Sequence, residues 1–95
     1  MSVKIIIRRI VPEDKTKLLT PLFRKLRALA MNHSGYISGE TLGCVNDPRE
    51  FLVISSWQSE KDWENWLHHP ERAVIQDQID ALTGQKTEYR IYTNT

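Results

Sequence analysis

The sequence predicts a single α+β domain, residues 1–95, whose strands and helices follow the order β-α-β-β-α-β. Segments rich in β-branched residues alternate with segments whose apolar residues recur at helical spacing. Turn-forming residues separate these segments along the chain. The 95 residues, 40% of them hydrophobic and 26% charged, are typical of one globular domain and leave room for only one core.

Residues 3–11 are rich in Ile and Val and predict a buried strand. A helix follows, opened by Pro12 and the two acids after it and ended by the turn-forming residues 32–35. Its apolar residues recur at helical spacing at Leu18, Leu22, Leu26 and Leu29. Because a proline inside a helix removes a backbone donor, we expect Pro21 to cause a kink or a broken first turn.

Residues 36–45 and 50–58 predict two strands that form a hairpin through a turn at 46–49. The first of these strands contains Gly39 and Gly43. Glycine inside a strand indicates a bulge, a bend or a close approach of backbone.

A second helical region begins at Ser59, which forms a capping-box pattern with Asp62. We expect a break at His69, because the residue before a proline avoids helical geometry. Pro70 suits the first position of a second piece, 70–82, with a predicted apolar stripe. The stripe consists of Val74, Ile75, Ile79 and Leu82. Gly84 is a typical helix stop, and residues 85–93 predict the last strand.

This order is the ferredoxin-like arrangement, with a four-stranded antiparallel sheet and the helices on one of its faces. Both faces of this sheet are predicted to be apolar, since Ile6 and Ile10 point opposite to the other apolar residues of the first strand, and Leu52 and Ile54 do the same in the third. A sheet that faces water alternates more cleanly between apolar and polar residues. We therefore expect a homodimer joined through the open sheet faces.

Charge and cysteine content limit the partners of the chain. Thirteen basic and twelve acidic residues give a net charge of +1, so we expect neither a nucleic-acid nor a membrane partner. The one cysteine, Cys44, is interpreted as a small buried hydrophobe in a reducing compartment. No secretory leader, metal-ligand spacing or phosphate-binding loop is visible, so we expect a cytoplasmic protein without a metal.

The run GYISGETL, followed by FLVISSWQSEKDWENWLHHPE, resembles the antibiotic biosynthesis monooxygenase family, and the resemblance covers essentially the whole chain. It implies a dimeric α+β barrel. The leading function it implies is that of a cofactor-independent monooxygenase acting on a small electron-rich aromatic, a quinol or a phenol. The alternative is a non-catalytic dimeric barrel that binds or senses a small molecule. Fold alone does not decide between them.

Haem degradation, a third activity found in that family, is less favoured. Members with this activity carry an Asn on the first strand, a Trp on the second helix and a His further along as iron ligand. Trp66 matches the Trp, but residues 3–11 contain no Asn and residues 70–82 contain no His. Gln76 lies near the ligand position, and a Gln amide is a poor haem ligand beside imidazole. We therefore expect no cofactor.

The phenol-oxidising members of the family imply a pocket between sheet and helices, with an Asn and a Trp on the second helix. The nearest matches are Asn65 and Trp66, whose side chains point about 100° apart around a helix. Tyr and Arg residues assist in those members. The residues that we expect to contact substrate are Trp63, Asn65, Tyr36 and Arg9.

Three residues are candidates for catalysis, and each also has a structural interpretation. Trp66 either lines the pocket and donates its indole N–H, or packs in the core beside Trp63. His68 and His69 titrate near neutrality, so either can serve as the base, or they are surface or capping residues near the helix break. The cluster of Arg24, Lys25 and Arg27 is interpreted as a solvated helix face.

Overall fold

The computed structural model describes residues 1–95 and confirms the predicted α+β ferredoxin-like fold. The strands are β1 (Val3–Ile10), β2 (Tyr36–Cys44), β3 (Asp47–Trp57) and β4 (Glu88–Thr93). The helices are α1 (Thr16–Met31), α2 (Glu60–Leu67) and α3 (Pro70–Thr83), and a short 3-10 helix, η1 (Glu13–Lys15), precedes α1. All predicted elements are present, and the helical region after β3 is divided into two helices as expected.

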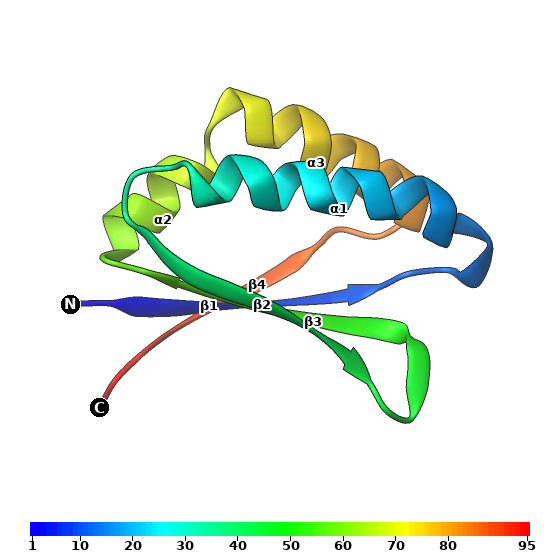
Figure 1. Ribbon diagram of the computed structural model, residues 1–95, viewed down its shortest axis with the longest axis horizontal. Helices are drawn as coiled ribbons and strands as arrows, with labels where there is room; N and C mark the ends of the chain where they lie inside the picture. Colours follow the sequence, from blue (N-terminus) through cyan, green and yellow to red (C-terminus); the bar gives the residue numbers. More distant parts are fainter.

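The four strands form one antiparallel sheet in the order β2-β3-β1-β4. Figure 1 shows the three helices on one face of this sheet and nothing on the other. Along β1, the odd-numbered residues are buried beneath the helices and the even-numbered ones point to the open face. The core therefore lies between the sheet and the helices. Its buried apolar residues are Val3, Ile5, Ile7, Val11, Leu19, Leu26, Ala30, Trp57, Trp63, Trp66, Ile75 and Ile79.

Side chains at the helix ends explain why the chain breaks where it does. Ser59 Oγ caps α2 by accepting from the backbone N–H of Asp62 at 3.1 Å. His68 ends α2, and His69 caps α3, because His69 Nδ1 accepts from the backbone N–H of Glu71 at 3.2 Å. Pro70 occupies the first turn of α3, where no backbone donor is needed. The predicted capping pattern and the predicted break at His69 are both confirmed.

Two proline residues behave differently from expectation. Pro21 lies inside α1, which continues unbroken from Thr16 to Met31; the only irregularity is η1 before it. The carbonyl left without a donor is that of Lys17, an exposed residue that water can reach. The predicted turn at 46–49 is too long. Because Cys44 pairs with Asp47, β3 begins three residues earlier, and Pro48 lies in an irregular stretch of the β2–β3 pairing.

The open face of the sheet carries apolar side chains, with surface ion pairs at one end. Ile6 pairs with Ile54 across β1 and β3, and both are only half-buried in the single chain. Leu42 pairs with Leu52 on the same face and is exposed. Tyr92 of β4, opposite Lys4, is also exposed. The open face is therefore apolar, as the sequence predicts.

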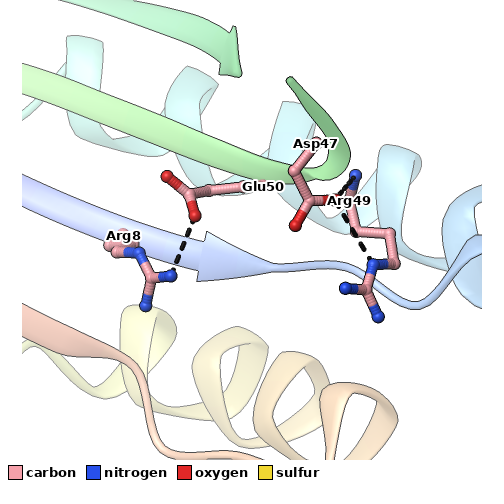
Figure 2. Close-up of polar contacts among 4 residues, drawn as sticks. All are labelled: Arg8, Asp47, Arg49 and Glu50. Atoms are coloured by element: carbon pink, nitrogen blue, oxygen red, sulfur yellow. Dashed lines mark hydrogen bonds and ion pairs between the residues drawn. The ribbon is translucent and has the colours of Figure 1, made fainter. Parts of the chain in front are cut away.

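Figure 2 shows two ion pairs at one end of this face. Arg8 Nη2 donates to Glu50 Oε1 at 2.8 Å, and this hydrogen bond and the charge of Glu50 raise the pKa of Arg8. Asp47 accepts from both the backbone N–H and Nε of Arg49, which lowers the pKa of Asp47. Both pairs are exposed to solvent, so each adds little stability to the isolated chain.

Gly35 joins α1 to β2 at a point where no other residue fits. Its φ of 88° lies in the left-handed region, and a Cβ added there would lie 2.3 Å from Asp62 Cγ. Gly84, at the end of α3, has a similar φ of 71° but nothing within 4 Å of its Cβ position. A side chain at Gly84 would therefore meet backbone strain alone, whereas a side chain at Gly35 would meet both strain and a steric collision.

We predict that Gly35→Ala destabilises the protein more than Gly84→Ala does. Gly84→Ala should lower the free energy of unfolding by about 1 kcal/mol, the cost of placing a side chain in left-handed geometry. Gly35→Ala adds a collision with Asp62 and should cost at least about 2 kcal/mol. Urea unfolding of both variants measures the difference. Equal losses would contradict the tight junction between α1, β2 and α2.

Candidate functional site

A cavity of about 310 Å³ lies between α1 and the sheet. Side chains of β1, β2 and β3 form its floor, α1 forms its roof, and Trp63, Trp66 and Arg72 close its inner end. Exposed residues of α1 and of the edge strand β2 also border it, which places its opening between these two elements. Its size is within the range of small-molecule sites, roughly 300–1,000 Å³.

The cavity is hollow because small side chains face α1 from the strands beneath it. Gly39, Thr41 and Ser55 all border it. Gly39 has a second constraint, since a Cβ there would lie 2.6 Å from the hydroxyl oxygen of Tyr36. Any larger residue at this position would displace that phenol ring from the cavity wall.

Aromatic rings form the wall at the end nearest α2. Trp57 contacts Tyr36, Trp63 and Trp66, with ring centres 5.4, 5.8 and 6.5 Å away. Trp57 Nε1 donates to Ser55 Oγ at 3.1 Å, so its N–H is already used. The indole N–H groups of Trp63 and Trp66 have no acceptor within the chain, yet neither nitrogen is fully covered. They are therefore able to donate to a bound molecule.

The wall next to these rings is cationic, and Arg72 Cζ lies 5.7 Å from the ring centre of Trp63. Arg9 of β1 and Arg72 of α3 both border the cavity and are buried, with 6% and 4% of their surface exposed. Each donates to the same oxygen, Gln76 Oε1, at 3.4 Å. Arg72 also donates to the hydroxyl of Tyr89, and Arg9 donates to Thr87 Oγ1 at 3.2 Å.

Electrostatics at this wall are unusual for a chain of nearly neutral charge. Burial lowers the pKa of Arg9, and the positive charge of Arg72 lowers it further. The nearest acid in the hydrogen-bond network is Asp80, which Gln76 and Thr87 contact through Oδ1 at 2.8 and 3.0 Å. Asp80 itself forms no ion pair with either arginine. The two guanidinium groups are thus held by neutral partners.

The structure brings four of the seven residues expected at the site into one wall or another of the cavity. They are Trp66, Trp63, Tyr36 and Arg9. Asn65 is exposed on the outer side of α2, in keeping with the angle that separates it from Trp66. His68, at the end of α2, is exposed as well and does not border the cavity.

His69 lies behind the tryptophan wall rather than in it. Its ring centre is 6.0 Å from that of Trp66 and 5.5 Å from that of His33. His33 in turn lies 5.3 Å from Trp66. Trp66 therefore separates two imidazoles from the cavity, and no histidine lines the cavity directly.

Sequence reasoning missed Arg72 and did not foresee that two exposed arginines of α1 border the cavity. The buried face of α3 carries Arg72, Ile75, Gln76 and Ile79, whereas Val74, assigned to the apolar stripe, is 61% exposed. The spacing of positions 72, 75, 76 and 79 was the available signal, because polar residues there share a helix face with two isoleucines. Arg24 and Arg27 are exposed, as expected of a solvated face, and also border the opening of the cavity.

No group of three or more His, Cys, Asp or Glu side chains is arranged to hold a metal ion. No helix has the length and apolar character needed to cross a membrane.

Several solved structures have the same fold as this chain. A conserved protein from Methanosarcina mazei Go1 is 15% identical, with a TM-score of 0.92 over 100% of this chain and 94% of that one. Rv0793 from Mycobacterium tuberculosis is 14% identical, with a TM-score of 0.88 over 100% and 96%. SnoaB from Streptomyces nogalater, a cofactor-independent oxygenase, is 16% identical, with a TM-score of 0.81 over 99% and 93%.

At such low identities these structures establish the fold alone. A comparison with functionally curated proteins found no match. The sequence profile of one family, described as antibiotic biosynthesis monooxygenase, matches residues 2–78 and supports a function of the monooxygenase type. Because the match spans most of the chain and all elements except the end of α3 and β4, the chain belongs to the antibiotic biosynthesis monooxygenase family.

Proposed function

We propose that the protein is a cofactor-independent monooxygenase that oxidises a small electron-rich aromatic, a quinol or a phenol, in the cavity beneath α1. The observation that carries this proposal is an apolar cavity with tryptophan at one wall and buried arginines beside it. Membership of the monooxygenase family and the fold shared with SnoaB support it.

The chemistry makes three demands on the protein. A deprotonated quinol or phenol passes an electron to O₂, so the site must accept its proton and stabilise the resulting oxyanion. It must also exclude water from the reactive intermediates. In the completed reaction one atom of O₂ enters the ring and the other leaves as water. A dihydroxynaphthalene and O₂ then give a hydroxynaphthoquinone and water.

We assign these demands to residues around the cavity. Trp63 and Tyr36 hold the substrate ring, and the indole N–H of Trp66 donates to the developing oxyanion. Arg9 adds positive charge from below. Of the two histidines, His69 is the better candidate for the base, since its ring centre lies 6.0 Å from that of Trp66 while His68 faces solvent; its proton transfer with the substrate would pass through an intervening water.

The second candidate is a module that binds or senses a small molecule without turnover. The observation in its favour is the absence of any histidine from the cavity wall, which leaves no imidazole in direct contact with a ligand. Both candidates use the same cavity, so turnover is what separates them.

We also propose that two chains associate through their open sheet faces. Ile6, Leu42, Leu52 and Ile54 support this arrangement, because together they expose an apolar surface that a second sheet would cover. Obligate interfaces of this kind commonly bury on the order of 2,000 Å² or more.

We expect the protein to consume O₂ with a dihydroxynaphthalene and to place one labelled oxygen atom in the product. The measurement is oxygen uptake above the spontaneous rate, followed by mass spectrometry of the quinone formed under isotopically labelled O₂. Peroxide formation without label in the ring would indicate simple oxidation. Tight binding of the quinol without any uptake would favour the binding module.

We predict that Trp66→Phe and His69→Asn lower the rate of oxygen uptake by about 100-fold each, while the fold is retained. Phe keeps most of the buried volume of Trp66 but loses the N–H. Asn keeps a capping acceptor at position 69 but loses the imidazole. His68→Asn is the matched control and should change the rate less than about twofold. If His68→Asn and His69→Asn reduce the rate equally, the assignment of the base is wrong.

We predict that the unmodified chain is a dimer by light scattering at low micromolar concentration. Ile54→Glu should produce a folded monomer, because it places a charge in the centre of the apolar face. Val74→Glu makes the same change on the exposed side of α3 and should leave the dimer intact. A monomeric unmodified protein would overturn the sheet-to-sheet arrangement.

A further inference from the structure

The residues around the cavity carry an excess of positive charge that the chain as a whole lacks. The net charge of the chain is +1. Four arginines border the cavity: Arg9, Arg24, Arg27 and Arg72. The one acid that borders it, Glu40, pairs with Ile54 in the sheet, so strand alternation assigns its side chain to the open face. A molecule that enters the cavity therefore meets cations at both the opening and the inner end.

The two inner arginines, Arg9 and Arg72, have no counter-ion. The ion pairs of the chain are Arg8–Glu50 and Arg49–Asp47, and both lie at the surface. A buried charge is costly unless a partner of opposite charge or good hydrogen bonds compensate it. Two such charges on neighbouring elements repel each other as well. The energetics of this wall thus favour the arrival of an anion.

The hydrogen bonds of these groups are incomplete. Arg72 Nε is fully buried without an acceptor, and it is the one buried side-chain polar atom of the chain in this condition. Arg9 and Arg72 share a single oxygen of Gln76, and both of these bonds are long at 3.4 Å. A ligand oxygen at this wall would allow one guanidinium to release Gln76 and would strengthen the bonds of the other.

The rest of the cavity defines what the anion must be attached to. The indole planes of Trp57 and Trp66 are nearly parallel, 22° apart, and Phe23 lies beneath α1 with its ring centre 5.1 Å from Arg9 Cζ. Such a cavity accepts a planar apolar body. A singly charged, planar carboxylate fits the guanidinium fork and loses less hydration on burial than a doubly charged phosphate does.

We propose that the cavity binds an aromatic carboxylate, with its ring against Trp63 and Trp66 and its carboxylate between Arg9 and Arg72. This inference rests on the proposed function for the use of the cavity as the substrate site. It adds that the substrate carries an acidic group separate from the ring oxygen that takes part in oxidation. Arg24 and Arg27 at the opening attract the same anion from solvent.

A pair of probes that differ only in charge tests the proposal without any turnover. Naphthoate and the matching naphthamide have the same ring and nearly the same shape, and neither is a quinol. Quenching of the fluorescence of Trp63 and Trp66, checked by calorimetry, gives both affinities at neutral pH. Naphthoate should bind at least about tenfold more tightly than naphthamide, the effect of one charge-assisted hydrogen bond.

Variants then assign the preference to residues. Arg72→Gln and Arg9→Gln should each reduce the preference for naphthoate to less than about threefold while naphthamide affinity stays the same, which also shows that the cavity is intact. Arg49→Gln removes one surface charge and should leave the preference unchanged. Naphthalene sulfonate in place of naphthoate tests whether carboxylate geometry or charge alone is recognised, and binding as tight as that of naphthoate would overturn the carboxylate assignment.

Two results would overturn the proposal as a whole. Equal affinities for naphthoate and naphthamide would show that the buried arginines serve packing rather than recognition. Failure of both probes to bind would show that the cavity does not accept this ligand class. Oxygen uptake with a dihydroxynaphthalene is measured separately, so the monooxygenase proposal survives or fails independently of either result.

Discussion

The shared hydrogen bond of two buried guanidinium groups to Gln76 Oε1 governs one whole end of this structure. Arg9 belongs to β1, Arg72 and Gln76 belong to α3, and Thr87 lies in the segment that leads into β4. A single polar network therefore holds these three parts of the chain together. Replacing such a network with well-packed apolar side chains is often neutral or stabilising in other proteins. Folding alone therefore gives little reason for burying two arginines here, whereas recognition of a ligand gives a direct one.

The cavity that the same two arginines border lies between α1 and the sheet, where small side chains leave space. Gly39, Thr41 and Ser55 leave space that larger residues would fill, and an unfilled core costs stability because its lining loses dispersion contacts. The tryptophan cluster compensates nearby, since Trp57 and Trp63 are almost fully buried and contact each other edge to face. The tightly packed rings of Trp57 and Trp63 thus close the cavity near α2, while the space beneath α1 stays unfilled.

The spacing of apolar residues along the chain made most of the fold predictable, whereas part of the site consists of residues that depart from this spacing pattern. The break at His69 could be predicted because proline acts on its immediate neighbour, and Trp63 and Trp66 share a face by simple helical spacing. Arg72 was overlooked because a charged residue on a buried face departs from the amphipathic pattern, although its spacing from Ile75 and Ile79 places it on that face. The turn before β3 was misjudged because Pro48 is tolerated in an irregular pairing, a tertiary fact that sequence does not carry.

Under the proposed function, the two walls of the cavity contribute to the reaction in different ways. A carboxylate held by Arg9 and Arg72 is already charged before the reaction, so its binding energy is the same in the ground state and in the transition state. That energy serves to position the ring against Trp66. The indole N–H faces an oxygen whose negative charge grows as its proton is removed, before the electron passes to O₂, so its contribution is larger in the transition state of that step. Substrate selection therefore belongs to the cationic wall, and rate acceleration belongs to the tryptophan wall.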